Sequence, residues 1–317
     1  MGLQILGWGS ALPGKIVTNA DLEKTLDTSD EWIVERTGIR ERRIGTHTAD
    51  LAIEAGRVAL AHAAIDPATI DLAILCTTTP DETVPATSAR VHQELGLGGG
   101  AFDLNAACSG FVYGLVAASG MLSTGARRVL LVGAETLSRI TDWQDRSTAV
   151  LFGDGGGALV LERSEDPGQL LSWDLGLDGT AREILKAEVG GWIEMDGREV
   201  FKRAVRAVVE SASRTLEAAG CGPEDVALLV PHQANIRIIQ AACERLGIEL
   251  DRTALVIGHT GNTSSASIPL AWIEAIEKGR LKQGDRVLLT GFGAGMTWAS
   301  ALIEWRSPAN EGKVSRA

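Results

Sequence analysis

A chain of 317 residues that is 45% hydrophobic and 22% charged can bury a large core, either as one domain or as two fused halves of about 150 residues each. Its formal net charge of −11 argues against a nucleic-acid partner, which would require a dominant basic face. We see no signal peptide, and no apolar run reaches the roughly 18 residues that span a bilayer, so we expect a cytoplasmic protein without a membrane partner.

Along the chain, short apolar runs alternate with helical patterns. The runs are bounded by glycine or polar residues, which is typical of strands buried on both faces. A polar insertion at 19–47 follows the first strand. The helical patterns cover roughly 48–62, 84–95, 109–124, 198–219, 235–246 and 263–278. This alternation predicts an α/β fold with a largely parallel sheet covered by helices.

Several strand patterns occur twice, which predicts an internal duplication of a β-α-β-α-β-β unit. The similar pairs are 71–78 with 225–232, 128–133 with 286–291, and the Gly-rich closing turns and strands 153–161 with 293–303. The boundary is expected in the polar stretch 162–197. We therefore assign an N-terminal half to 1–165 and a C-terminal half to 166–317.

Cys108 is the strongest candidate nucleophile in the sequence. It stands where a predicted strand ends and a helix begins, so unpaired backbone N–H groups and the positive end of the helix dipole would face its thiol. That environment predicts a lowered thiol pKa. A small buried hydrophobe is the alternative interpretation. Cys76, Cys221 and Cys243 show no metal-ligand spacing, and we expect them to be structural thiols.

His232 and Asn262 are the candidate partners of the cysteine. His232 follows the strand at 225–231, at the carboxyl end where α/β folds gather ligands. The segment that contains Asn262 occupies the same place in the second half as the cysteine segment does in the first. If the halves are related by a pseudo-twofold axis, Cys108 and Asn262 would face each other at helix N-termini. The alternative for Asn262 is a purely local helix-capping role.

With these segments in view, the chain resembles the 3-oxoacyl-(acyl-carrier-protein) synthase III family over nearly its whole length. The resemblance implies a thiolase-like fold whose duplicated halves form a five-layered α-β-α-β-α core. The motifs that carry it lie, in the family's order, at 7–13, 30–40, 103–111, 144–146, 152–155, 197–201, 232–235, 261–264 and 292–295.

The resemblance implies a condensation in two half-reactions, without a cofactor or a metal. Cys108 takes the acyl group from acyl-CoA, and malonyl-acyl carrier protein then loses CO2 to give the attacking carbanion. His232 and Asn262 donate hydrogen bonds to the enolate oxygen. Backbone N–H groups of Cys108 and Ala294 hold the other oxyanion. The product would be a 3-oxoacyl carrier protein that initiates fatty acid synthesis, made by a homodimer.

Substrate contacts are also implied by the resemblance. For CoA they are Thr28, Trp32, Arg36 and Arg146, with Trp32 and Arg146 enclosing the adenine. For the carrier protein they are Arg237 and Lys202. For the acyl chain they are Val84, Leu137, Phe152, Met195 and Phe201, with a loop around 80–87 reaching the pocket from a partner subunit. Trp32 as a core aromatic, and Arg36 and Lys202 as solvated helix charges, remain alternatives.

Competing functions are distinguished by the same residues. A same-fold acyltransferase or condensing enzyme of specialised, polyketide-type metabolism would share the Cys-His-Asn set. A thiolase would need a second cysteine in the closing turn, where Cys221 and Cys243 do not fall. A dinucleotide-binding protein is disfavoured because Leu12 and Pro13 interrupt the Gly7-Trp8-Gly9 fragment. A non-catalytic dimer partner is disfavoured because no catalytic position is lost.

Overall fold

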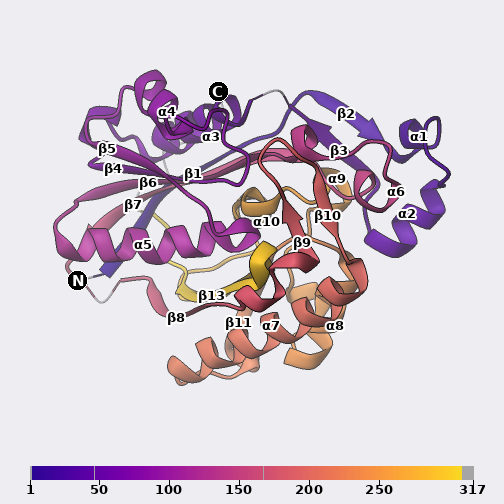
Figure 1. Ribbon diagram of the computed structural model, residues 1–317. Helices are drawn as coiled ribbons and strands as arrows, with labels where there is room; N and C mark the ends of the chain where they lie inside the picture. The colour runs from indigo at the N-terminus through magenta and orange to yellow at the C-terminus, as the bar shows by residue number, and fades with distance from the viewer. Residues whose placement is uncertain (1, 46, 167, 309–317) are drawn as a thin grey trace.

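The computed structural model describes residues 2–45, 47–166 and 168–308, and its core is two sheets interleaved with helices (Figure 1). The first sheet has the strand order β1-β7-β6-β4-β5 and the second β11-β12-β13-β8. The bounds in the first are β1 (Gly2–Ala11), β4 (Leu72–Cys76), β5 (Gly100–Leu104), β6 (Arg128–Thr136) and β7 (Asp154–Ser164). The bounds in the second are β8 (Leu170–Leu177), β11 (Val226–Pro231), β12 (Arg286–Gly293) and β13 (Thr297–Glu304).

Five layers result, as the resemblance implied (Figure 1). The helices α3 (Thr48–Ala63) and α4 (Thr87–Leu95) cover the outer face of the first sheet. Between the sheets lie α5 (Gly110–Thr124) and α10 (Ser267–Glu277), and the largest apolar core forms around them. The helices α7 (Gly197–Ala218) and α8 (Ile236–Leu246) cover the second sheet.

The predicted duplication is visible in the strand pairing. In the first sheet β4 pairs parallel with β6, and β6 pairs antiparallel with β7. The second sheet repeats this with β11, β12 and β13. Each sheet is therefore mixed, and the prediction of a largely parallel sheet is wrong. The last strand of each unit pairs antiparallel with the strand before it. The first half also exceeds the expected unit by one strand and one helix, since β5 and α5 both precede β6.

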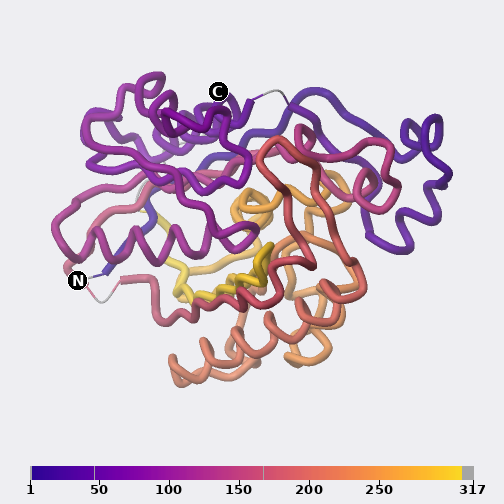
Figure 2. The backbone as a smooth tube through the Cα atoms, in the orientation of Figure 1, coloured from indigo at the N-terminus to yellow at the C-terminus, as the bar shows by residue number. Residues whose placement is uncertain are grey.

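The short elements lie at the periphery and around the cavity described below. The insertion at 19–47 contains α1 (Asn19–Leu22), α2 (Asp30–Thr37) and β3 (Glu41–Ile44), and β2 (Lys15–Thr18) comes just before it. These elements pack beside α6 (Arg146–Ala149) and α9 (Ile257–Thr260). The hairpin of β9 (Leu185–Ala187) and β10 (Ile193–Met195) leaves the second half and reaches α6 of the first, as the tube in Figure 2 shows.

Residues Ala107–Thr124 form one helical stretch that is long and apolar enough, by length and composition, to cross a membrane. The sequence expectation that no such run exists is therefore wrong for this segment. In the structure the segment includes α5, which lies between the two sheets with Phe111, Leu115 and Leu122 in the core. Its apolar composition is explained by this position, because a helix between two sheets is surrounded by apolar side chains.

Candidate active site

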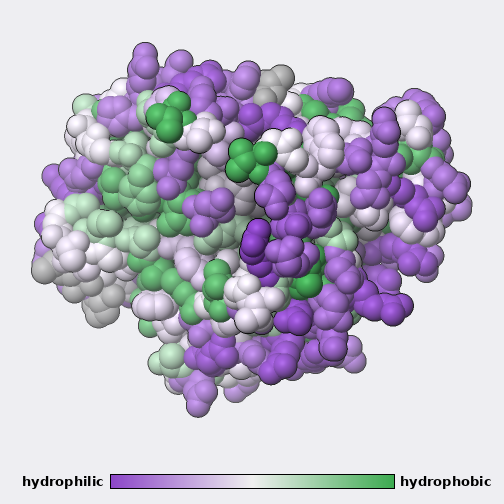
Figure 3. All heavy atoms as spheres, viewed as in Figure 1, coloured by the Kyte–Doolittle hydropathy of each residue, from purple (hydrophilic) through white to green (hydrophobic). Residues whose placement is uncertain are grey.

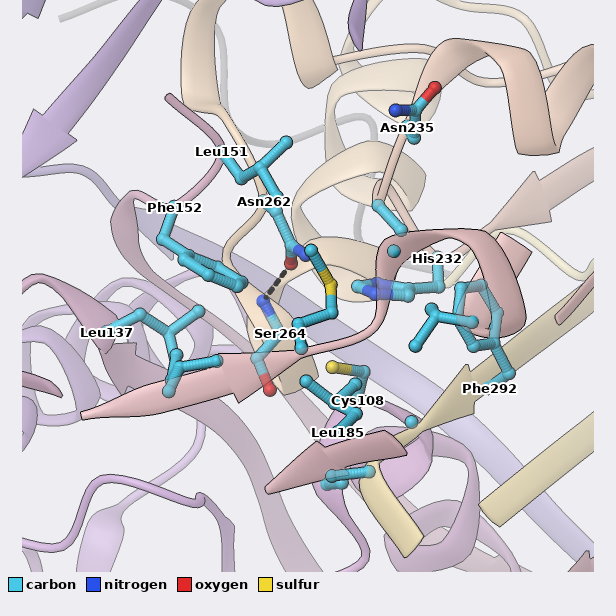
Figure 4. Close-up of a pocket in the computed structure, with 18 of the residues that line it drawn as sticks. Cys108, Leu137, Leu151, Phe152, Leu185, His232, Asn235, Asn262, Ser264 and Phe292 are labelled. Carbon is cyan, nitrogen blue, oxygen red and sulfur yellow. Dashed lines mark hydrogen bonds between the residues drawn. The ribbon is translucent and has the colours of Figure 1, made fainter. Parts of the chain in front are cut away.

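A cavity of about 960 Å³ opens where the two halves meet. Side chains from both halves line it, so neither half contains the site alone. Most of the residues that the sequence marked for chemistry or substrate contact line this one cavity: Trp32, Arg36, Cys108, Leu137, Phe152, Met195, Phe201, His232, Arg237, Asn262 and Ala294. Figure 4 shows Cys108, His232 and Asn262 around a common space.

Cys108 stands on a single 3₁₀ turn, η2 (Ala107–Ser109), between β5 and α5. The strand, turn and helix arrangement predicted from the sequence is confirmed. The predicted lowering of the thiol pKa is wrong, because burial raises the pKa of Cys108 to about 12. The Ser264 side chain opposes this rise. A sulfur enclosed by protein loses the water that would stabilise its charge, and here that loss outweighs the favourable position before a helix.

His232 follows β11 and is only 3% exposed. Its Nδ1 lies 2.6 Å from the Ser267 hydroxyl, and that hydroxyl oxygen accepts a hydrogen bond from the Gln233 backbone N–H. Among the described residues, Nδ1 is the acceptor within reach of the Ser267 proton. The ring proton is therefore assigned to Nε2. Burial also lowers the pKa of His232 to about 3, so the ring is a neutral donor at physiological pH.

Asn262 is held by its backbone against the segment of the first half that precedes β7, where it forms an isolated bridge with Phe152. Its N–H donates to the Leu151 carbonyl at 2.9 Å, and its carbonyl accepts from the Gly153 N–H at 3.0 Å. The side-chain Oδ1 accepts from the Ser264 N–H at 2.9 Å. This bond assigns the amide orientation, and it leaves the Nδ2 donors for the cavity. The local capping bond is therefore present, and the functional role of this amide stays a prediction.

The two halves present the same turn to the cavity. In the first half, Asn105 Oδ1 accepts from the Ala107 N–H at 3.1 Å, and Ala107 has a φ of 49°. In the second, Asn262 makes the same bond to Ser264, whose φ is 47°. Each turn continues through a 3₁₀ turn into a central helix. The predicted correspondence between the Asn262 segment and the cysteine segment is thus confirmed, and within these segments Asn262 corresponds to Asn105.

The second expected oxyanion site is formed where β12 approaches Cys108. A Cβ on Gly293 would lie 2.5 Å from the Cys108 backbone nitrogen, so the two segments touch through a glycine. Ala294, the next residue, lines the cavity. The Thr297 hydroxyl donates to the Ala106 carbonyl at 3.2 Å and keeps this contact in place. The expected roles of the Cys108 and Ala294 N–H groups remain predictions.

At the mouth of the cavity, two arginine side chains pack against the ring of Trp32. The guanidinium carbons of Arg36 and Arg146 lie 5.1 Å and 5.0 Å from its ring centroid. A base enclosed between Trp32 and Arg146 needs about 7 Å, two stacking contacts of about 3.5 Å each. The two side chains therefore have to separate before they could enclose an adenine. Arg146 also donates to the Asp27 carbonyl at 2.8 Å.

Four residues named from the sequence do not line the cavity: Arg146, Val84, Thr28 and Lys202. Val84 is 84% exposed and is not among the residues that line the cavity. Thr28 is absent from the lining, and its hydroxyl is buried without a partner among the described residues. Lys202 lies exposed on α7, whereas Arg237 stands at the cavity mouth on α8. In each case the linear motif contains no information on where the side chain points.

Sequence reasoning missed three polar residues at the site. Ser267 positions His232, and Ser264 lines the cavity beside Cys108. Glu135, buried at the end of β6, accepts from the Ser265 hydroxyl at 2.8 Å. A signal was present, because Asn105-Ala106-Ala107 and Asn262-Thr263-Ser264 align residue by residue once the duplication is recognised. Glu135 gave no such signal, since a carboxylate in an apolar run does not reveal its partners.

Comparisons with known proteins agree with this geometry. Residues 102–179 match the family model described as 3-oxoacyl-[acyl-carrier-protein (ACP)] synthase III, and residues 216–305 match the model of its C-terminal part. The chain is 50% identical to a beta-ketoacyl-[acyl-carrier-protein] synthase III of Roseiflexus castenholzii, over 95% of this chain and 97% of that protein. A synthase III of Listeria monocytogenes is 49% identical, over 96% and 99% of the two chains.

Solved structures are similar to the same degree. The crystal structure of 3-oxoacyl-[acyl-carrier-protein] synthase III from Aquifex aeolicus superposes with a TM-score of 0.94 at 47% identity, covering 96% of this chain and all of that one. The priming beta-ketosynthase of the R1128 polyketide pathway superposes with a TM-score of 0.92 at 38% identity, over 96% and 97% of the two chains.

A duplicated thiolase fold with a cysteine, a neutral histidine and an asparagine in one cavity defines a condensing enzyme of the acyltransferase class. The relatives that share about half of their residues with this chain, over nearly the full length, identify one family within this class. The chain belongs to the beta-ketoacyl-[acyl-carrier-protein] synthase III family.

Proposed function

We propose that this chain condenses an acyl-CoA primer with malonyl-acyl carrier protein, giving 3-oxoacyl carrier protein, CoA and CO2. One observation carries the proposal: a thiol, a neutral imidazole and a primary amide meet in one cavity. These are the groups that acyl transfer followed by decarboxylation requires. Family membership and the names of the relatives support the same choice of substrates.

In the first half-reaction, the Cys108 sulfur attacks the thioester carbonyl of acyl-CoA. The tetrahedral oxyanion is held by the Cys108 and Ala294 N–H groups. The C–S bond to CoA then breaks, and the leaving CoA sulfur takes up the proton that Cys108 gives up. His232 does not act as the base in this scheme, because its pKa of about 3 makes it a poor proton acceptor.

In the second half-reaction, the malonyl thioester loses CO2 and leaves an enolate. His232 donates to its oxygen through Nε2–H, and Asn262 donates through Nδ2–H. Neutral donors suit this task, because they are placed before the charge develops and lose no proton to it. The carbanion then attacks the acyl group on Cys108, and Cys108 leaves as a thiolate that regains a proton from solvent. No step requires a metal or a cofactor in this proposal.

Arg237 supports the proposed carrier-protein contact. It lies exposed at the cavity mouth, and its guanidinium has no ion pair among the described residues. An unpaired cation beside the entrance can meet an acidic partner despite the net charge of −11. Arg198 also lines the entrance. We place Lys202 at the edge of the same contact.

A priming enzyme of specialised metabolism is the second candidate, and the 38% identity to a priming ketosynthase of a polyketide pathway supports it. The chemistry would be the same, with a different primer or carrier protein. A thiolase is not supported, because the closing turn 292–297 contains no cysteine. The first candidate is favoured because the relatives at 47–50% identity are synthases III.

The acylation step is tested by incubating the purified protein with a panel of acyl-CoAs and recording its intact mass. We expect one acyl mass on the wild type and none on Cys108→Ser. The same spectrum identifies the primer class. If no acyl-CoA adds mass to folded protein, acylated carrier protein is offered next. Absence of an adduct there as well would contradict the proposed function.

We also propose that the enzyme works as a homodimer in the cytoplasm. The strand β5 forms one edge of the first sheet, so its outer backbone groups lack a neighbouring strand. Apolar surface gathers on the face that carries α5 and β5, at the left of Figure 3. Exposed apolar side chains near it include Met121 on α5 and Trp173 and Leu177 on β8. A second copy would cover this face.

Light scattering after size exclusion tests the dimer. We expect twice the chain mass of 33.4 kDa for the wild type. Met121→Glu, which places a charge on the proposed interface, should shift the mass toward the monomer. Glu244→Gln, a neutral change at an exposed position on α8, which covers the second sheet, serves as the control. A monomeric wild type at micromolar concentration would contradict the proposal.

A further inference from the structure

The Ser264 hydroxyl is a buried polar group that the reaction scheme above does not use. Its side chain is 1% exposed, and the residue lines the same cavity as Cys108. The hydroxyl oxygen completes no hydrogen bond with any described group. Figure 4 shows Ser264 beside Cys108. An unpaired buried hydroxyl is costly, so its presence requires an explanation.

The fold does not supply that explanation. Ser264 has a φ of 47°, a conformation in which residues with a Cβ are uncommon. The equivalent turn of the first half contains Ala107 in the same conformation, with a φ of 49° and the same bond from its N–H to an asparagine oxygen. An alanine therefore satisfies this turn. The hydroxyl at position 264 adds nothing that the turn needs.

We propose that Ser264 is a catalytic residue for acyl transfer, whose hydroxyl donates a hydrogen bond to the Cys108 sulfur when that sulfur becomes a thiolate. The inference rests on the proposed function and refines it. A neutral thiol is a weak acceptor, so the bond is incomplete in the resting site. A thiolate is a strong acceptor, so the bond forms as charge develops. Stabilisation confined to the charged state lowers the barrier without tightening the resting state.

The electrostatics of Cys108 agree with this geometry. Burial raises the pKa of the thiol, and the Ser264 side chain is the largest influence that opposes the rise. Without it, the sulfur would depend on the backbone alone. The hydroxyl keeps its own proton throughout. In the first half-reaction the thiol proton ends on the CoA sulfur, and in the second the departing Cys108 thiolate receives the same hydrogen bond before solvent protonates it.

The test is the rate at which iodoacetamide alkylates Cys108, measured from pH 6 to 9 by intact mass. Ser264→Ala removes the hydroxyl and leaves the turn intact, as Ala107 shows. Thr263→Val is the matched control, because the neighbouring Thr263 hydroxyl is also buried and unpartnered but lies outside the cavity lining. Hydrogen bonds to charged groups predict an alkylation rate about 10- to 100-fold lower in Ser264→Ala at each pH.

We expect the line of log rate against pH to move to higher pH in Ser264→Ala and to stay in place in Thr263→Val. The acylation rate with the preferred acyl-CoA should fall by a similar factor. An unchanged line for Ser264→Ala, or an equal displacement in Thr263→Val, would overturn the proposal. Alkylation needs no acyl-CoA, so a wild type that alkylates as expected but accepts no acyl thioester would refute the proposed function separately.

Discussion

At the scale of single residues, the site depends on protons being fixed before substrate arrives. The Ser267 hydroxyl holds His232 with its proton on Nε2, and the Ser264 N–H fixes the orientation of the Asn262 amide. Both donors are therefore prepared for a negative oxygen. The two side chains are only 3% and 7% exposed, so little water competes for them.

Ser267→Ala is expected to damage decarboxylation more than acylation. Without the hydroxyl, Nδ1 has no donor, and the imidazole can place its proton on the wrong nitrogen. We expect CO2 release from malonyl thioester to fall about 10- to 100-fold, the usual effect of losing one oxyanion donor or its orientation. Acylation of Cys108, followed by intact mass, should change less than threefold. Ser267→Thr keeps a hydroxyl and should recover most of the loss. Equal losses in both half-reactions would contradict the assigned role.

At the scale of elements, the ends of two equivalent strands, β12 and β6, bring the candidate reacting groups together. The end of β12 reaches the Cys108 backbone through Gly293, and the end of β6 reaches the second half through Glu135. The Glu135 carboxylate also accepts from the Thr78 and Thr79 backbone N–H groups at 3.0 Å and 3.1 Å. One side chain thus ties β4 to the turn that carries Ser264 and Ser265.

Gly293→Ala is expected to separate β12 from η2. The added Cβ would lie 2.5 Å from the Cys108 nitrogen, closer than atoms tolerate, so one segment has to move. A shift of this kind misplaces the proposed oxyanion donors, and we expect the acylation rate to fall at least about tenfold. Rapid-quench mass spectrometry measures it. Gly14→Ala, where a Cβ meets nothing within 4 Å, is the control. A rate equal to that of the control would contradict this account.

Glu135→Gln is expected to lower the free energy of unfolding by roughly 2–4 kcal/mol. The glutamine NH2 would replace one carboxylate oxygen, so the buried N–H and O–H donors that face this oxygen would lose their acceptor. Urea denaturation followed by circular dichroism measures the change. Glu94→Gln on the exposed face of α4 should cost less than about 1 kcal/mol, since it breaks only a surface ion pair at 4.0 Å. Similar costs for the two variants would show that the buried network contributes little.

At the scale of the whole molecule, the burial of neutral His232 makes the stability of the fold depend on pH in the acid range. The unfolded chain takes a proton on His232 below its ordinary pKa of 6.5, whereas the folded chain resists until about 3. Protonation therefore favours unfolding within this window. Stability from this residue is complete above about pH 6.5 and is lost as pH falls toward 3.

Protonation of His232 in the unfolded chain is expected to lower the free energy of unfolding by about 1.4 kcal/mol for each pH unit below 6.5. The loss reaches roughly 4 kcal/mol near pH 3. Urea unfolding of the wild type and of His232→Gln at a series of pH values measures it. The difference between the two curves isolates this residue, because the carboxylates that also titrate are common to both proteins. A difference that stays constant between pH 6.5 and 4 would contradict a strongly lowered pKa for His232.

The sequence by itself determined the architecture and the candidate reacting groups. Apolar runs and helical periods located the central helices to within about four residues, and the repeated strands revealed the duplication. Cys108, His232 and Asn262 followed from where each stands relative to a strand end. These features are local, so a linear pattern can contain them.

The tertiary structure alone decided how those groups behave. It reversed the expected direction of the Cys108 pKa, because burial depends on the surrounding chain and not on the helix start. It assigned the His232 proton through Ser267, which lies 35 residues away, and it joined Glu135 to Ser265 across 130 residues. It also placed Val84 outside the cavity lining. Such contacts join distant segments, and their energies depend on burial and direction, which no local pattern records.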